Sequence, residues 1–218
     1  MIEALLPSPV ASADTVGELD EPLFAVEEAA VARVAPIRHR EFRSVRGCAR
    51  LALARLGFPR PPMVPGERGA PTWPPGIVGS MTHCPGYRAA AVARDTELAG
   101  LGIDAEEDAP LPEGVLELVT LPGERERLAS LARHHPDLPW GRLVFSAKES
   151  VYKAWFPLAR CWLAFEDVDV TFDERGAFRA DVVGGELAPG ARPFASVHGR
   201  WLVAGGLVVT AVTVPITG

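Results

Sequence analysis

The sequence predicts an α+β protein of two halves, each a helix followed by short antiparallel strands. Three observations carry this prediction. Apolar residues with helical spacing run over residues 38–56 and again over 140–158. Segments rich in apolar and β-branched residues, broken by glycine turns, follow each of these stretches. The turn-rich segment "DAPLPEG", residues 108–114, separates the two sets of elements.

The first helix is expected from Arg38 to Leu56, because Gly57 and Pro59 end it. Its core face repeats apolar residues at helical spacing: Phe42, Val45, Ala49, Leu53 and Leu56. A neighbouring stripe carries three arginines: Arg43, Arg46 and Arg50. The plainer interpretation is a solvated charged face. No acid shares the stripe, however, and unpaired like charges repel, which favours a bound anion.

The rest of the first half is expected to be a broken connector and three strands. Residues 58–76 hold too much Pro and Gly for regular structure. A strand over 77–84, a turn at Pro85-Gly86 and a strand from Tyr87 to Ala93 then follow. The segment "LAGLGIDAE", residues 98–106, is expected to complete a small antiparallel meander.

The second half begins with helical segments near residues 114–119 and 123–133, followed by a long helix from about Trp140 to Leu158. Strands are expected over 167–172 and 177–183, and a hairpin over 201–214 turns at Gly205-Gly206. We therefore divide the chain into subdomains 1–108 and 109–218. The halves are not detectably alike in sequence, so a duplicated architecture rests on the order of elements alone.

Composition excludes several classes of protein. The 218 residues are 48% hydrophobic, enough for one sizeable core or two small ones. No stretch approaches the roughly 20 apolar residues of a membrane span, and the acidic N-terminus lacks the basic region of a signal peptide. Cys48, Cys84 and Cys161 are far apart without a C-x-x-C spacing, which favours a reduced cytoplasmic interior over disulfides or zinc.

The net charge of −6 argues against general nucleic-acid binding. The charge is nevertheless uneven, because seven arginines lie between Arg33 and Arg55 against the single acid Glu41. A local cationic patch on an acidic protein indicates a specific anionic ligand rather than a polyanion.

Two acids end the predicted third strand. Asp104 and Glu106 stand at i and i+2, so their side chains leave the same face. Two carboxylates held together repel, which raises the pKa of one unless a cation intervenes. The plainer interpretation is a charged strand end entering a solvated turn, which Glu107 and Asp108 would begin.

The long helix contains a second group of charged residues in "FSAKESVYKAW", residues 145–155. Its buried face is expected to hold Leu143, Ala147, Val151, Ala154 and Leu158. Glu149 and Lys153 share another side, where a simple surface pair would contribute only about 0.2–0.5 kcal/mol, and Lys148 projects elsewhere. Together with the strand acids, Glu149 would complete a Mg²⁺–phosphate site, with both lysines binding phosphate oxygens as point charges.

These motifs resemble those of a known family. "GIDAE" (102–106) and the motif at 145–155 resemble the signature pair of the 4′-phosphopantetheinyl transferases. "VRGCARLAL" (45–53) and "VGSMTHCPGYRAAAVA" (78–93) resemble further motifs of the surfactin/enterobactin-synthetase type. The matching pieces run from about residue 38 to 162 in the family's order, and four ordered motifs are far more specific than one.

The resemblance implies that the chain moves the 4′-phosphopantetheine arm from coenzyme A to a serine of an apo acyl or peptidyl carrier protein, leaving 3′,5′-ADP. It implies that Asp104, Glu106 and Glu149 bind Mg²⁺, or Mn²⁺ in its place, on the pyrophosphate, and that Lys153 contacts the phosphates. Glu149 is the favoured base for the carrier serine, with Lys148 or a metal-bound water as open alternatives.

The resemblance also implies a clamp for the adenosine phosphate. His83 corresponds to the family's 3′-phosphate ligand, and Arg46 with Arg38 would complete the clamp; Arg43 and Arg50 have weaker claims. Pro65 occupies the place of a phosphate-binding lysine in some relatives, so either Arg68 takes its role or the contact is absent. Ala105 offers a backbone carbonyl but no side-chain ligand, which leaves the remaining metal positions to water.

The implied fold is a pseudo-dimer of two similar α/β subdomains, with coenzyme A in the cleft between them. The resemblance further implies a cytoplasmic monomer serving polyketide, nonribosomal-peptide or siderophore synthesis, without nucleic-acid or membrane partners. Two alternatives stay open. Another Mg²⁺-dependent phosphoryl transferase would predict a glycine-rich phosphate loop, which the sequence lacks. A non-catalytic coenzyme A or carrier-binding module fits less well, because every acid and lysine expected for turnover is present.

Overall fold

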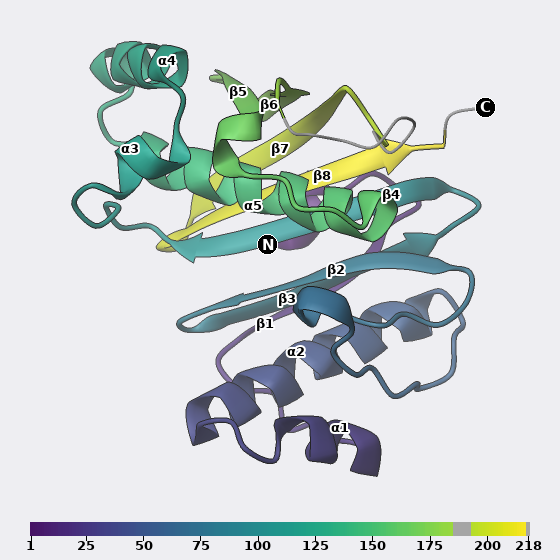
Figure 1. Ribbon diagram of the computed structural model, residues 1–218. Helices are drawn as coiled ribbons and strands as arrows, with labels where there is room; N and C mark the ends of the chain where they lie inside the picture. The colour runs from purple at the N-terminus through teal and green to yellow at the C-terminus, as the bar shows by residue number, and fades with distance from the viewer. Residues whose placement is uncertain (185–192, 217–218) are drawn as a thin grey trace.

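The computed structural model describes residues 1–184 and 193–216 and consists of two antiparallel sheets stacked between two long helices (Figure 1). One sheet has the strand order β1-β3-β2 and the other β4-β8-β7-β6-β5. The predicted α+β class, with a helix on each antiparallel sheet, is confirmed.

The strands are β1 (Ala11–Val16), β2 (Ile77–Cys84), β3 (Tyr87–Arg94), β4 (Leu98–Glu107), β5 (Val168–Asp173), β6 (Ala177–Val182), β7 (Ser196–Ala204) and β8 (Leu207–Pro215). The α-helices are α1 (Ala25–Val31), α2 (Pro36–Arg55), α3 (Val115–Val119), α4 (Pro122–His134) and α5 (Trp140–Ala159). Three short 3₁₀ helices are η1 (Ile2–Leu5), η2 (Glu67–Gly69) and η3 (Phe165–Asp167). In the described part of the chain, no helix has the length and apolar character needed to cross a membrane.

Helix α2 covers the outer face of the three-stranded sheet. Pro36 stands in its first turn, where a fixed φ and a missing N–H are no handicap. Ala49 and Leu53 are buried against Ala90 of β3 and its neighbours, and Val45 is also buried, as the helical spacing predicts. Phe42 and Leu56, from the same predicted face, are only partly buried.

Strand β1 and helix α1 have no counterpart in the elements expected from sequence. The β1 segment "ASADTV" is short, and its small polar residues have low strand propensity. It forms a strand because it pairs with the buried strand β3, Ala11 opposite Val92. Tertiary pairing therefore supplies what local preference does not.

The predicted three-stranded meander is wrong, because strand β4 belongs to the other sheet. It pairs with β8, Asp104 opposite Thr210, and is the edge strand of the five-stranded sheet. The break between the sheets thus falls between β3 and β4, before the expected boundary at residue 108. The side chains of Leu101, Ile103 and Ala105 still face the first sheet, in a shared core between the two sheets.

Helix α5 crosses the other face of the five-stranded sheet (Figure 1). Leu143, Ala147, Val151 and Ala154 are buried there, as predicted. Leu158 is the exception, with 37% of its surface exposed. It lies instead on the wall of a cavity.

Candidate active site in the cleft between the two sheets

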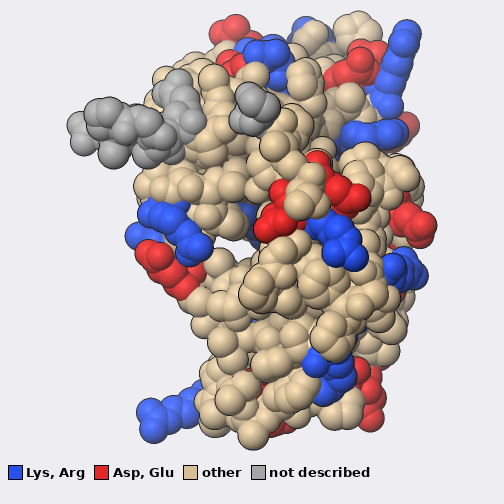
Figure 2. Space-filling view, turned by 90° about the vertical axis from the view of Figure 1, so that its right-hand side faces the viewer, with Lys and Arg blue, Asp and Glu red and all other residues tan. Residues whose placement is uncertain are grey.

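A cavity of about 870 Å³ opens between the two halves of the chain. Its walls come from α2, the connector containing η2, β2, the start of β4 and the second half of α5. Figure 2 shows the molecule hollowed at mid-height, with basic and acidic side chains at the edge of the hollow. A smaller cavity of about 310 Å³ adjoins it and shares Arg38, Glu41 and His83.

A glycine brings β4 and α5 together at this cavity. A Cβ atom on Gly102 would lie 1.9 Å from the Ser150 carbonyl oxygen and 2.8 Å from the Ala154 nitrogen. Only glycine lets the strand approach the helix backbone this closely. Asp104, two residues along on the same face of β4, is thereby carried to the helix side that bears Lys153.

Asp104 is buried and paired with Lys153. The Lys153 Nζ lies 2.7 Å from the Asp104 Oδ1 and 3.2 Å from the Ile103 carbonyl oxygen. The Thr82 hydroxyl donates to the same Oδ1 at 3.3 Å and accepts the Ala105 N–H at 3.0 Å. Strand β2 of the first sheet therefore holds the free edge of β4 through side chains rather than through a strand ladder.

Glu106 lies on the same side of β4 and is paired with Arg142 of α5 at 3.2 Å. Arg142 also donates to the carbonyl oxygens of Ala109 and Pro110, which fixes the end of the strand. Burial raises the pKa of Glu106 to about 6, and the negative charge of Asp104 adds to this rise. The predicted repulsion between the two strand acids is thus present.

Glu149 lines the large cavity one helical turn before Lys153. Burial raises its pKa; the Lys153 charge opposes this rise, and the Asp104 charge adds to it. Glu149 and Glu106 each respond to the charge of Asp104. The structure therefore brings the three predicted carboxylates into one electrostatic neighbourhood.

The donor chemistry of this neighbourhood fits a hard divalent cation, which prefers carboxylate oxygens. The Oδ2 atom of Asp104 is buried and has no hydrogen-bond partner among the residues that the structure describes. A buried carboxylate oxygen without a partner is costly unless a cation or donor reaches it. Among residues 1–184 and 193–216, however, no three His, Cys, Asp or Glu side chains are gathered closely enough to form a metal-binding group. The predicted ligands are thus neighbours rather than a preformed coordination shell.

The predicted phosphate residues Arg38 and His83 meet at the entrance shared by the two cavities. The Arg38 Nη1 lies 2.9 Å from the His83 Nε2 and donates to the Glu41 Oε2 at 3.0 Å. Burial lowers the pKa of His83, the Glu41 charge opposes this, and the charges of nearby cations add to the lowering. Sequence analysis singled out Arg38 and His83 but gave no role to Glu41.

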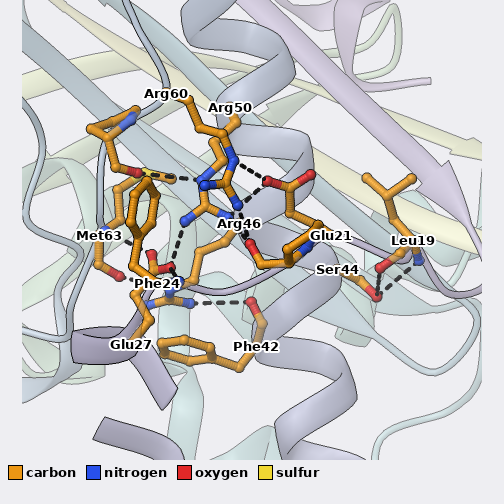
Figure 3. Close-up of polar contacts among 12 residues, drawn as sticks. Leu19, Glu21, Phe24, Glu27, Phe42, Ser44, Arg46, Arg50, Arg60 and Met63 are labelled. Carbon is orange, nitrogen blue, oxygen red and sulfur yellow. Dashed lines mark hydrogen bonds and ion pairs between the residues drawn. The ribbon is translucent and has the colours of Figure 1, made fainter. Parts of the chain in front are cut away.

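The arginine stripe of α2 has acidic partners, contrary to the premise drawn from the sequence. Acids from the segment before the helix pair with it: Arg43 with Asp20, and the buried Arg50 with Glu21 and Glu27. Figure 3 shows the contacts of Arg50 with Glu21 and Glu27, next to Arg46. The absence of acids within the stripe itself was therefore no sign that the stripe lacks partners.

Arg46 lines the cavity but is held by the protein. Its Nε donates to the Met63 carbonyl oxygen at 2.8 Å, and its guanidinium carbon lies 3.1 Å from the centre of the Phe42 ring (Figure 3). Burial lowers the pKa of Arg46 to about 10, against the opposing charge of Glu27. Glu27 also accepts the Met63 N–H at 2.7 Å, so the same network holds the connector against α2.

Lys148 is not part of the cleft, which corrects its predicted catalytic and phosphate-binding roles. Its Nζ is buried, 2.7 Å from the Glu124 Oε2 of α4, and donates to the Phe165 carbonyl oxygen at 2.8 Å. Burial lowers the pKa of Lys148, and the hydrogen bond that Lys148 donates to Glu124 opposes this. Lys148 stands one residue before Glu149, and this helical offset turns its side chain away from the face that Glu149 and Lys153 share.

Arg68 and Pro65 both lie on the cavity wall. Arg68 has a left-handed backbone (φ 51°), which is unusual for a residue with a Cβ atom. Its guanidinium carbon lies 5.4 Å from the centre of the Trp162 ring, so the connector and the segment after α5 are in contact beside the cavity. Arg68 is thus close enough to the cavity to take the role of the lysine that Pro65 replaces.

Sequence reasoning missed four residues that shape the site: Thr82, Arg142, Glu41 and Arg88. The alternation of Ser80 and Thr82 in "GSMTH" could have indicated a polar strand face toward β4, where the Ser80 hydroxyl accepts the Ile103 N–H. Arg142 and Arg88 gave no local signal, because their acidic partners Glu106 and Glu41 are distant in sequence. Glu41 stands three residues after Arg38, a helical spacing that could have indicated their ion pair.

Comparison with known families covers most of the chain. The 4′-phosphopantetheinyl transferase N-terminal domain matches residues 26–93, and the 4′-phosphopantetheinyl transferase superfamily matches residues 100–210. The two matches meet between β3 and β4, where the structure changes from one sheet to the other.

Individual relatives agree with these matches. The chain is 52% identical to the 4′-phosphopantetheinyl transferase Svp of Streptomyces mobaraensis, over 98% of this chain and 89% of that protein. It is 47% identical to the transferase Npt of Nocardia iowensis, over 97% of this chain and 99% of the relative. Enterobactin synthase component D of Escherichia coli K12 is 34% identical over 54% of each chain.

Proposed function

The chain belongs to the 4′-phosphopantetheinyl transferase superfamily, and from this premise we propose that its cleft binds coenzyme A beside the serine of a carrier protein. It is an enzyme that transfers 4′-phosphopantetheine from coenzyme A to carrier proteins. The observation that carries the proposal for the site is the cluster of Asp104, Glu149 and Lys153 where β4 meets α5.

Coenzyme A would lie with its adenosine phosphate at Arg38 and His83. The Arg38 guanidinium and the His83 imidazole meet at the mouth shared by the two cavities, and both are groups that can donate hydrogen bonds to a phosphate. Arg46 adds positive charge to the wall while holding Met63. Lys153 and Arg68 would face the pyrophosphate, Lys153 from α5 and Arg68 from the connector.

Asp104, Glu106 and Glu149 would hold a divalent cation, Mg²⁺ or Mn²⁺. The partnerless Oδ2 of Asp104 and the raised pKa values of the two glutamates support this assignment, because all three need compensating positive charge. When bound, such an ion neutralises charge that develops on the pyrophosphate oxygens.

The chain's own groups supply the rest of the chemistry. The serine oxygen of the carrier would attack the phosphorus that bears the pantetheine arm, while the bond from that phosphorus to the bridging oxygen breaks and 3′,5′-ADP leaves. Glu149 would accept the serine proton, and its raised pKa makes it a stronger base than an exposed glutamate. Lys153 would stabilise the negative charge of the phosphoryl oxygens, as phosphoryl transfer requires.

A mass-shift assay tests this assignment. The protein is incubated with coenzyme A, Mg²⁺ or Mn²⁺, and several apo-carriers, and addition of phosphopantetheine is followed by intact mass. We expect Glu149→Gln to lower kcat by about 10²–10⁴-fold with an unchanged Tm, which is the usual contribution of a general base. Glu126→Gln is the matched control, because Glu126 is exposed on α4 and lies outside both cavities.

The outcomes separate the alternatives. A wild-type rate for Glu149→Gln would refute Glu149 as base and as metal ligand. Binding of coenzyme A without addition to any carrier would favour a binding module. Full activity after thorough chelation would refute the metal assignment while leaving the transferase itself intact.

For the carrier protein, we propose a class rather than an individual protein. The name of enterobactin synthase component D connects one relative to enterobactin synthesis. We propose carriers of siderophore, polyketide or nonribosomal-peptide synthesis, to be ranked by kcat/KM on a panel of apo-carriers. A cytoplasmic location and a monomeric state stay predictions.

A further inference from the structure

A buried acid stands among the cationic groups at the mouth of the cleft. Glu41 of α2 has a side chain that is 11% exposed. Two guanidiniums and one imidazole from three elements surround its carboxylate; we call them the cationic cluster, after the two guanidiniums: Arg38, His83 and Arg88. The closest Glu41 oxygens lie 3.0 Å from the Arg38 Nη1, 3.5 Å from the His83 Nε2 and 3.8 Å from the Arg88 Nη2.

Arg88 is the one member of the cluster that was not among the predicted site residues and has no role in the proposed function. It stands directly opposite His83 in the β2–β3 ladder, so both side chains leave the same face of the sheet, toward α2. Arg88 is 6% exposed, and its Nε has no hydrogen-bond partner in the described chain. Its Nη1 donates to the Cys84 carbonyl oxygen at 3.4 Å, which leaves hydrogen-bonding capacity directed at Glu41.

One carboxylate therefore faces more positive charge than it can balance. Arg38 and Arg88 each bring a guanidinium to this carboxylate, and cations held this close repel one another unless an anion lies between them. Glu41 supplies that anion from within the chain. A phosphate monoester would carry up to two negative charges to the same place, where it would meet attraction from the cluster and repulsion from Glu41.

We propose that Glu41 is a specificity-determining residue whose carboxylate competes with the 3′-phosphate of coenzyme A for the cationic cluster. This inference rests on the proposed placement of that phosphate at Arg38 and His83. Binding of the phosphate is an exchange in which the Arg38 and Arg88 guanidiniums pass from Glu41 to the ligand. Glu41 keeps the cluster assembled and sets the affinity gained from the 3′-phosphate.

Glu41→Gln tests the exchange, because glutamine keeps the shape and the acceptor for Arg38 but removes the charge. Dissociation constants for coenzyme A and dephospho-coenzyme A, which lacks the 3′-phosphate, are measured by calorimetry at pH 8. At that pH the imidazole of His83 is neutral in both proteins, since burial lowers its pKa. We expect coenzyme A to bind about three- to tenfold more tightly and dephospho-coenzyme A to bind unchanged, a size typical of a partly screened charge.

Glu28→Gln is the matched control, since it removes an acid that pairs with the half-buried His39 on α2, outside both cavities. Arg88→Met supplies a second variant, and we expect it to lower the preference for coenzyme A over dephospho-coenzyme A. An unchanged or smaller preference in Glu41→Gln would overturn the inference, as would an unchanged preference in Arg88→Met. Equal binding of both ligands by the wild-type protein would instead refute the 3′-phosphate placement itself, and the inference with it.

Discussion

Lys153 of α5 and Asp104 of β4 form an ion pair of 2.7 Å at the point where the two halves of the chain meet. The pair satisfies one oxygen of Asp104 and leaves the other, Oδ2, buried without a partner in the described part of the chain. A carboxylate that is half compensated in this way remains an acceptor for further positive charge. The pair thus fixes the position of the acid without using up its capacity as a ligand.

The first prediction concerns the glycine that makes this pair possible. We expect Gly102→Ala to destabilise the protein by at least about 1–3 kcal/mol, because its Cβ would lie 1.9 Å from the Ser150 carbonyl oxygen and neither backbone can yield cheaply. Activity should fall further than stability requires, since β4 carries Asp104. Chemical unfolding and the mass-shift assay measure the two effects.

Gly141→Ala is the control on the same helix. Its Cβ would meet only Leu111 and Leu116 side chains at 3.5 Å or more, so it should be neutral or slightly stabilising. Equal stability of the two variants would contradict the close approach of β4 to α5.

The second prediction separates Lys148 from Lys153. Lys148→Met should destabilise the protein by about 3–5 kcal/mol, because it leaves Glu124 buried without its cation. The folded fraction should bind coenzyme A with unchanged affinity. Lys148→Met combined with Glu124→Gln should recover part of the lost stability, and a double-mutant cycle measures the coupling. Weaker binding of coenzyme A at full stability would return Lys148 to the cleft.

These two positions also show what sequence spacing can predict. Helices α2 and α5 and the hairpin of β7 and β8 follow from local periodicity and turns, so their positions agree with expectation to within a few residues. The face shared by Glu149 and Lys153 follows from the same geometry. Spacing along one helix cannot predict the partner of a side chain when that partner lies on another element. Lys148, for example, is paired with Glu124 of α4 and does not line the cleft.

The pairing of β4 shows the same limit at the level of the sheet. The segment reads as a strand, but its partner β8 lies at the far end of the chain. Local sequence favoured its immediate neighbour β3. The arginines of α2 were misread for a related reason, because Glu27 and Glu21 reach them from residues before the helix begins.

The third prediction concerns pH. The pKa of Glu106 is raised from 4.5 to about 6, so the folded protein holds this proton more tightly than the unfolded chain does. Stability contributed by this group is therefore present below pH about 4.5 and is lost as the pH rises through about 6, by at most about 2 kcal/mol. Glu106→Gln should remove this part of the pH dependence, as measured by unfolding at pH 4.5 and 7.

Added Mg²⁺ extends the test. If the ion binds the ionised carboxylates as proposed, it should raise the Tm of the wild-type protein more at pH 7 than at pH 5. The gain should be smaller in Glu106→Gln. A gain that is equal at both pH values would contradict the role of Glu106 as a ligand.

The last prediction concerns the contact between Arg68 and Trp162 beside the cavity. Trp162 is 58% exposed, and its ring accepts the Arg68 guanidinium from the connector. An exposed contact of this kind contributes about 0.5–1 kcal/mol. If it closes the connector over coenzyme A, Trp162→Ala should raise the dissociation rate about two- to fivefold and leave kcat nearly unchanged. Leu118→Ala, which removes an exposed apolar side chain of α3 outside both cavities, should change neither quantity.

Arg68→Ala then tests whether Arg68 also takes the role of the phosphate-binding lysine that is absent at Pro65. A loss of affinity no larger than that of Trp162→Ala would mean that Arg68 only holds the connector, whereas a clearly larger loss that shrinks at high salt would mean that it binds phosphate directly.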